Sequence, residues 1–215
     1  MNEEEYLLQF FIAEEVQNQS SQIFNSIFDT DSKTSSSPKG AFVSTAEPDY
    51  LSLYLDRFTS FEVNALMYQR DERRIDPSSQ DTASLTLIES KQLQEAVEFA
   101  VAAIGAPSEW LSGYFTNLIS RQELFGVWNE GRLIATGESR GYDEYQVGYA
   151  DLGVIVAEAE GKKGLATSIL RELAAMIEFN GLKSTCSTES SNLGAQKAIE
   201  RAGFFAGNRI LRFQT

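Results

Sequence analysis

The chain has 215 residues, of which 42% are hydrophobic and 23% charged, a composition typical of a soluble globular protein with one or two domains. Its 31 acidic and 18 basic residues give a net charge of -13, so neither nucleic acid nor an anionic membrane is expected as a partner. Because it has no histidine, Ser-His-Asp and Cys-His catalysis and His-containing zinc sites are excluded, and no metal is expected.

The first part of the chain, residues 1–80, predicts an additional N-terminal α/β region. Apolar residues at helical spacing indicate a helix within residues 3–28, and a Ser- and Thr-rich stretch, 29–40, indicates a surface loop. Two strands and a helix between them follow, at residues 41–45, 61–69 and 48–57. The polar run 70–84 predicts a boundary before a second domain over residues 82–215.

The second domain shows a regular order of elements. They are a strand at 85–89, helices at 91–104 and 107–122, strands at 123–128, 132–140 and 149–156, a helix at 164–180, a strand at 183–188, a short helix after Asn192 and a last strand at 209–214. Three meandering strands in the middle of this order predict an α+β fold with a mixed, mostly antiparallel sheet flanked by helices.

The most informative stretch is glycine-rich and lies between a predicted strand, which ends at Val156, and a predicted helix. It consists of Gly161, Lys162, Lys163, Gly164, Leu165, Ala166 and Thr167. Such a turn directs several backbone N–H groups toward one point, where the helix dipole favours phosphate. A P-loop is excluded because Lys163 is followed by Gly164, and neither the spacing nor the preceding meander fits a Rossmann fingerprint.

A second pattern follows the strand at 183–188. It reads Asn192-x-x-Ala195-x-x-x-Ile199-x-x-x-Gly203-Phe204, a short helix with a polar N-cap and a glycine stop. Together the two patterns and the element order over about residues 82–215 resemble the GNAT superfamily of acyl-CoA-dependent N-acetyltransferases. Gly164 and Ala166 match the end of its [QR]-x-x-G-x-[GA] pattern, and Val156 matches the valine of its preceding strand.

The resemblance implies how acetyl-CoA, the co-substrate, would be bound. Backbone N–H groups from Gly161 to Ala166 would hold the pyrophosphate, with the Thr167 hydroxyl as a further donor and positive charge from Lys162 and Lys163. The strand ending at Val156 would splay from its neighbour. Val154 and Val156 would then pair with the pantetheine arm, which the Asn192 amide would also reach, and the N–H groups of residues 154–156 would stabilise the oxyanion.

The chain departs from the family pattern at several positions. Gly161 replaces Gln or Arg, Lys162 stands where glycine is common, and Glu158 replaces a proline. Ile199 occupies the position at which many members carry a tyrosine thought to protonate the leaving thiolate. Another group or water would then supply that proton.

The attacking amine must also lose a proton, and without histidine the candidates are carboxylates or a water that they hold. Glu138 and Asp151 are the nearest by sequence order, and each is equally well explained as a solvated strand residue. Alternation along the strand places Asp151 opposite to Val154 and Val156 unless a bulge intervenes. A tyrosine cluster at 142, 145 and 149 either lines an acceptor pocket or is plain packing.

The cellular location is predicted from the cysteine content and the N-terminus. Cys186 is the single cysteine, which excludes an intramolecular disulfide, and it is expected to be a small buried side chain, not a nucleophile. The N-terminus is acidic where a signal peptide would be basic, and no apolar run is long enough to span a membrane. A cytoplasmic protein is expected.

We therefore expect an N-acetyltransferase that transfers an acetyl group from acetyl-CoA to a primary amine, in a small molecule or a peptide, by direct attack. The N-terminal region would shape the acceptor site or form a homodimer contact. Two alternatives stay open at this point: a non-catalytic or regulatory acyl-CoA-binding protein, which Ile199 suggests, and an interaction module that has lost the ligand.

Overall fold

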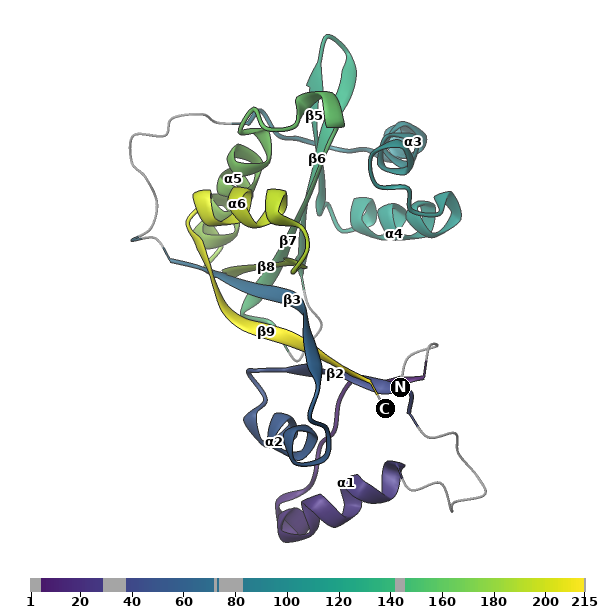
Figure 1. The fold of residues 1–215 in the computed structure, drawn as a ribbon. Coiled ribbons are helices and arrows are strands. Elements are labelled where there is room, and N and C mark those ends of the chain that lie inside the picture. The colour runs from purple at the N-terminus through teal and green to yellow at the C-terminus, as the bar shows by residue number, and fades with distance from the viewer. Residues whose placement is uncertain (1–4, 29–37, 72, 74–82, 142–145, 215) are drawn as a thin grey trace. The chain divides into compact units, whose positions relative to one another are not determined.

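The computed structural model describes residues 5–28, 38–71, 73, 83–141 and 146–214 (Figure 1). The chain forms two compact units. One consists of Met1–Met67, Glu189–Ser191 and Ala206–Thr215, and the other of Tyr68–Thr188 and Asn192–Phe205. Much of the loop expected at 29–40 and of the boundary expected at 70–84 lies outside the described residues. The predicted division at residues 80–82 therefore stays a prediction.

The first unit is a small sheet with helices beside it. It contains β1 (Tyr6–Leu7), α1 (Ser20–Phe28), β2 (Gly40–Ser44), α2 (Pro48–Arg57) and most of β3 (Phe61–Arg70) and β9 (Phe204–Gln214). The strand order is β1-β2-β9-β3, with β1 parallel and β9 antiparallel to β2. Its core is rich in aromatic residues, with Phe24, Tyr54 and Phe213 almost fully buried.

The helix predicted within residues 3–28 is only partly present. The structure has β1, then a 3-10 helix at Glu14–Gln19, and then α1, which begins at Ser20. Tyr6 pairs with Gly40 in parallel, and its ring centroid lies 5.1 Å from that of Phe42. Pairing with a strand distant in sequence thus overrides the local helical spacing. The last strand also differs from expectation, since β9 begins at Phe204 and not at residue 209.

The second unit is the mixed, mostly antiparallel sheet that the sequence predicts. It contains β4 (Thr86–Leu87), α3 (Leu93–Ile104), α4 (Ser108–Ser120), β5 (Leu124–Asn129), β6 (Arg132–Gly141), β7 (Tyr149–Val156), α5 (Leu165–Phe179), β8 (Lys183–Glu189) and α6 (Leu193–Arg201). The strand order is β8-β7-β6-β5-β4. Neighbouring strands are antiparallel except β7 and β8, which are parallel.

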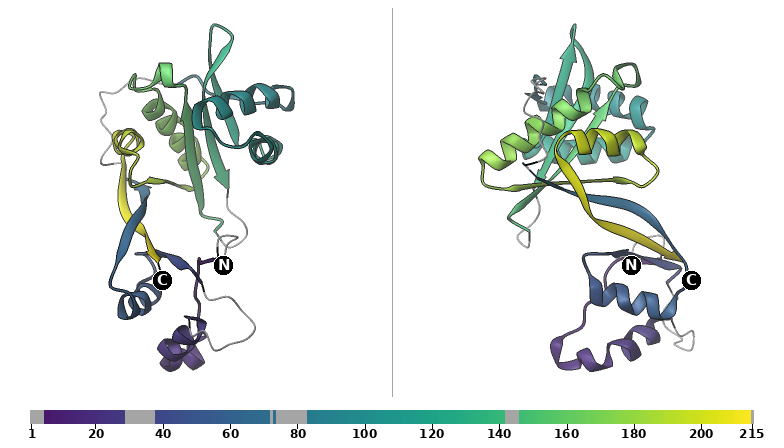
Figure 2. Two further views of the ribbon diagram at one scale, coloured as in Figure 1. Left: turned by 45° about the vertical axis from the view of Figure 1, so that its right-hand side comes forward. Right: turned by 60° about the vertical axis from the view of Figure 1, so that its left-hand side comes forward.

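Helices cover both faces of this sheet. Helix α5 lies on one face and helices α3 and α4 lie on the other (Figure 2). Helix α5 buries Ile169, Leu173 and Ile177 along the predicted stripe. It can approach β6 closely because Gly137 has no side chain: a Cβ there would lie 2.7 Å from Ile169 Cγ2 and 3.0 Å from Leu173 Cδ1. Within the described residues, no helix combines the length and apolar character that crossing a membrane requires.

Candidate active site

Strands β7 and β8 separate partway along their length. They pair at three positions, Tyr149 with Lys183, Ala150 with Ser184 and Asp151 with Thr185. Beyond these pairs β7 continues to Val156 and β8 continues to Glu189. The splay implied by the family resemblance is therefore present in the structure, and it leaves one side of β7 unpaired with β8 from residue 152 onward.

The hydrogen-bond phase of β7 decides which residues face this opening. The N–H of Ala157 donates to the Ile134 carbonyl of the β6 strand region at 2.9 Å. In an antiparallel ladder, residues alternate between pairs that exchange hydrogen bonds and pairs that do not. Because Ala157 belongs to a bonded pair, Val154 and Val156 belong to the other set. Their N–H and C=O groups thus point away from β6, toward the opening.

The glycine-rich turn before α5 has two residues in the left-handed conformation. Lys162 has φ 63° and Gly164 has φ 88°, whereas Gly161 is extended, with φ -61° and ψ 151°. Residues other than glycine rarely adopt a positive φ. This explains why glycine is common at the position of Lys162 in the family pattern. Helix α5 begins immediately after Gly164, so its first N–H groups lack partners within the helix and can bind an anion.

A groove of about 960 Å³ joins this turn to the opening beside β7. We call it the cofactor groove, because the family resemblance predicts that acetyl-CoA binds to these residues. It brings together most of the residues predicted to bind the cofactor, namely Val154, Val156, Gly161, Lys162, Gly164, Leu165, Ala166, Thr167 and Asn192. Lys163 does not line the groove, and its ammonium group pairs with Glu160 at 3.0 Å.

Two polar side chains of the groove are engaged within the protein. The Thr167 hydroxyl donates to the Ala198 carbonyl at 3.2 Å, so it joins α5 to α6 and its proton is not directed at a ligand. Asn192 Oδ1 accepts the Ala195 N–H at 3.0 Å and caps α6, as the sequence predicts. The nitrogen of the same amide can still donate to a ligand in the groove.

Cys186 and Ile199 also line the groove, and both are buried. Burial raises the pKa of the Cys186 thiol, and the charge of Asp151 raises it further, so the thiol stays protonated and inert. Ile199 is only 5% exposed and has no proton to give. The position at which the family carries a tyrosine thus supplies packing in this protein.

A second cavity, of about 320 Å³, lies on the side of β6 and β7 that faces α4. Its lining includes Trp110 and Tyr114 of α4 and Glu138 and Arg140 of β6. Four residues line both this cavity and the cofactor groove: Leu152, Gly153, Val154 and Ser187. The two hollows therefore share a wall where β7 leaves β8.

Glu138 is the predicted carboxylate that lines the second cavity. The Tyr114 hydroxyl donates to Glu138 Oε1 at 2.8 Å, and Arg140 Nε lies 3.4 Å from the same oxygen. Burial raises the pKa of Glu138 above its usual range, although Arg140 and the Tyr114 hydrogen bond oppose the shift. A carboxyl group whose pKa moves toward neutrality is suited to accept a proton from an amine.

Asp151 lies on the same face of the sheet as Glu138 and opposite to Val154 and Val156. The β6–β7 ladder keeps one register from Gly141 opposite Ala150 to Ala135 opposite Val156, so the alternation predicted from the sequence holds. The Asp151 carboxylate pairs with Arg140. Burial raises its pKa, and Arg140 opposes that shift. Asp151 lines neither cavity. In the structure it is an ion-pair partner of Arg140.

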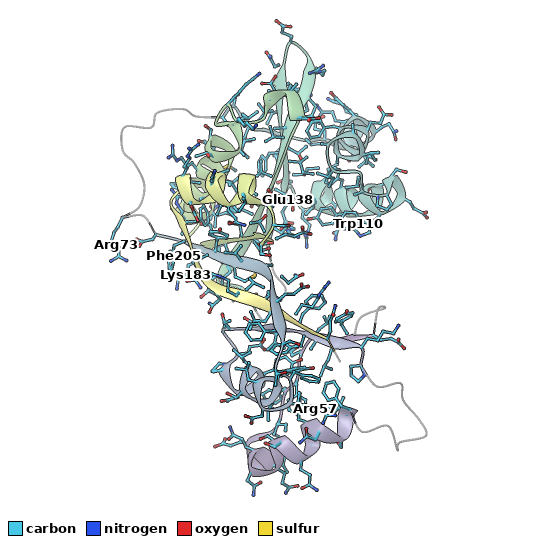
Figure 3. All side chains as sticks on the ribbon, in the orientation of Figure 1. Arg57, Arg73, Trp110, Glu138, Lys183 and Phe205 are labelled. Atoms are coloured by element: carbon cyan, nitrogen blue, oxygen red, sulfur yellow. The ribbon has the colours of Figure 1, made fainter. Side chains whose placement is uncertain are left out.

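The surroundings of Glu138 were not predicted from the sequence. In the sequence, Trp110 and Tyr114 follow the helical spacing of α4, and Arg140 follows the alternation of β6. Both patterns indicate packing and do not indicate a site. Figure 3 labels Glu138 on β6 and Trp110 on α4, two elements that fold together from separate parts of the chain. Of the tyrosines expected near the acceptor, those at 142 and 145 lie outside the described residues. Tyr149 lies beside Lys183, whose Nζ is 5.6 Å from the ring centroid.

Known proteins show similarity over nearly the whole chain. A family model described as Acetyltransferase (GNAT) family matches residues 90–204, and one described as Acetyltransferase (GNAT) domain matches residues 1–71. A solved GNAT-family acetyltransferase from Colwellia psychrerythraea is 44% identical, with a TM-score of 0.93, over 99% of this chain and 78% of that one. A comparison with curated proteins gave no match.

Two more distant structures support the fold alone. A GNAT-family acetyltransferase from Novosphingobium aromaticivorans is 23% identical, with a TM-score of 0.56, over 70% of this chain and 63% of that one. A GCN5-related N-acetyltransferase from Sphaerobacter thermophilus is 15% identical, with a TM-score of 0.60, over 81% of this chain and 58% of that one. The family model over residues 90–204 spans more than half of the chain, which therefore belongs to the GNAT family of acetyltransferases, whose members transfer acetyl groups from acetyl-CoA.

Proposed function

We propose that this protein is an N-acetyltransferase that transfers the acetyl group of acetyl-CoA to a primary amine by direct attack. The observation that carries the proposal is the wall shared by the two hollows. Gly153 and Ser187 line both the cofactor groove and the cavity that holds Glu138. An acetyl group delivered along the groove would therefore meet an amine held beside Glu138.

The cofactor groove suits acetyl-CoA at both ends. The Gly161 N–H donates to the Glu158 carbonyl at 3.0 Å, so the backbone N–H groups of residues 162–166 would bind the pyrophosphate at the start of α5, and Lys162 would add positive charge there. The outward-facing N–H and C=O groups of Val154 and Val156 would pair with the amides of the pantetheine arm. Asn192 would donate its amide hydrogens to the same arm.

The chemistry requires one bond to form and one to break. The amine nitrogen attacks the thioester carbonyl carbon, and the tetrahedral oxyanion is stabilised by the backbone N–H groups of Val154 and Val156, which face the opening. The C–N bond forms, the C–S bond breaks, and the coenzyme A thiolate leaves. Glu138 removes the proton that the amine must lose, directly or through a water.

Glu138 is preferred over Asp151 as this base because of where the two side chains lie. Glu138 lines the cavity that adjoins the groove, whereas Asp151 lines neither hollow and pairs with Arg140. Burial raises the pKa of both carboxyl groups, so the choice between them rests on position. In this proposal Asp151 positions Arg140.

A second candidate function is acyl-CoA binding without catalysis. Ile199 favours it, because an isoleucine cannot protonate the leaving thiolate. In the catalytic proposal that proton comes from another group or from water.

Calorimetric titration with acetyl-CoA and thiol release in the presence of amines separate the two functions. Catalysis predicts heat on titration and an amine-dependent release of coenzyme A. Heat without any amine-dependent release would favour the binding function. A flat titration would contradict both.

A further inference from the structure

Among the described residues, Arg140 is the only cationic side chain that lines the cavity beside Glu138. Arg140 pairs with Asp151 and lies 3.4 Å from Glu138, so two carboxylates surround its guanidinium group. The neighbouring Glu123 pairs with Arg121 at 2.6 Å and accepts the Gly141 N–H at 2.9 Å. With Glu138 and Asp151 ionised and Arg140 protonated, two negative charges and one positive charge leave this cluster with a net charge of -1.

This balance selects among amine acceptors. A protonated amine that approaches Glu138 is attracted by the net negative charge. A carboxylate on the same molecule would be repelled, because no unpaired guanidinium or ammonium group lines the cavity among the described residues. Amino acids, and peptides that end in a free carboxylate close to the amine, are therefore disfavoured.

Part of the cavity wall is aromatic. The rings of Trp110 and Tyr114 are stacked, with centroids 5.0 Å apart and planes inclined by 11°. Trp110 is 58% exposed although its ring is large and apolar, so one of its faces is available to a ligand. Because Tyr114 stacks on Trp110 and also donates its hydroxyl to Glu138, the aromatic wall and the base are connected through Tyr114.

We infer that the acceptor is a compact arylalkylamine, a primary amine attached through a short alkyl chain to an aromatic ring, without a carboxylate. Its ring would stack on Trp110, and its amine would reach Glu138. A cavity of about 320 Å³ holds such a molecule and is too small for a large acceptor to enter completely. This inference rests on the proposed N-acetyltransferase function and specifies its substrate class.

The test compares matched acceptors with the full-length protein and acetyl-CoA. Phenethylamine is paired with phenylalanine, tryptamine with tryptophan, and butylamine provides an amine without a ring. Each arylalkylamine should have a kcat/KM about 100-fold above that of its amino acid, the effect of a like charge about 6 Å away at an effective dielectric constant of about 20. It should exceed butylamine by about tenfold, the contribution of one aromatic stack.

The variant Trp110→Ala identifies the stacking wall. It should raise KM for phenethylamine about tenfold with little change in kcat, and leave KM for butylamine unchanged. Phe179→Ala, at an aromatic side chain of α5 that is 92% exposed and lines neither hollow, is the control and should change neither value.

The outcomes distinguish the inference from the function on which it rests. Amino acids that react as well as their arylalkylamines, or a Trp110→Ala variant with unchanged KM for phenethylamine, would overturn the inference and leave the N-acetyltransferase function intact. Binding of acetyl-CoA without thiol release for any amine would overturn the proposed function and the inference with it.

Discussion

Gly153 lies opposite Glu138 in the β6–β7 ladder, and the space that its missing side chain leaves is filled by the Glu138 carboxylate. A Cβ at Gly153 would lie 2.5 Å from Glu138 Oε1 and 2.8 Å from its Cγ. Non-bonded atoms do not come this close, so an added Cβ would force neighbouring atoms to move. The obstructing atoms belong to a flexible side chain, so the glutamate and not the sheet would give way.

Gly153→Ala should therefore weaken catalysis without unfolding the protein. Displacement of the Glu138 carboxylate from the Tyr114 hydroxyl is expected to lower kcat about tenfold or more, since general bases act within hydrogen-bond reach. The affinity for acetyl-CoA, measured by calorimetry, should change little. Gly113→Ala is the matched control, because a Cβ there meets nothing within 4 Å, and it should leave kcat unchanged. Equal kcat values in the two variants would contradict the role of Glu138.

The pH dependence of the rate tests Glu138 directly. Its pKa is raised by burial, so the ionised base is lost as the pH falls through a value above the usual carboxyl range, and kcat/KM should fall with it. Glu138→Gln should remove this acidic limb and lower kcat about 100-fold. Asp151→Asn should move the limb to lower pH, because the charge of Asp151 helps to raise the pKa of Glu138. An acidic limb that survives in Glu138→Gln would assign the base to another group.

The cofactor groove could be predicted from the sequence because its determinants are local. The glycine-rich turn, the N-cap at Asn192 and the stripe on α5 each follow from residues within a few positions of one another. The face of Asp151 was likewise predictable, since alternation within one strand decides it. The element order also followed from local residue patterns, and the GNAT resemblance added the splay of β7 from β8.

The surroundings of Glu138 could not be predicted in the same way. Tyr114 and Glu138 are 24 positions apart, and their hydrogen bond exists only because α4 packs on the face of the sheet opposite to α5. The same limitation explains β1, where pairing of Tyr6 with Gly40 overrides the helical spacing of residues 3–28. Long-range packing determines both the surroundings of Glu138 and the conformation of β1, and residue periodicity does not encode it.

Binding by the glycine-rich turn can be tested separately from stability. Gly164→Val places a β-branched residue at φ 88° and should rearrange the N–H groups at the start of α5, so the affinity for coenzyme A should be lost. Gly105→Val, at φ 68° after α3, imposes similar backbone strain away from the groove. Both variants should lose stability, and only Gly164→Val should lose heat on titration. Retained binding in Gly164→Val would exclude the turn from the site.

Two substitutions of Lys162 distinguish the effect of its charge on binding from the effect of its backbone conformation on stability. Lys162→Ala and Lys162→Gly both remove the ammonium group and should weaken coenzyme A binding equally, by about tenfold or less. Only glycine tolerates φ 63° without cost, so Lys162→Gly should be more stable than Lys162→Ala by about 1 kcal/mol in thermal unfolding. A large difference in affinity between the two variants would show that the conformation of the turn, and not the charge, controls binding.

Restoring the tyrosine of the family pattern tests how the leaving thiolate is protonated. Ile199 is buried and lines the cofactor groove, so Ile199→Tyr would place a phenol in the groove at the cost of about 1–3 kcal/mol from overpacking. If protonation of the thiolate limits the rate, kcat should rise about tenfold, a modest share of what a well-positioned general acid contributes. Ile199→Phe is the matched control, because it adds the ring without the hydroxyl and should leave kcat unchanged. Equal kcat values for the tyrosine and phenylalanine variants would contradict a limiting protonation step, and would mean that water or another group already supplies the proton at sufficient speed.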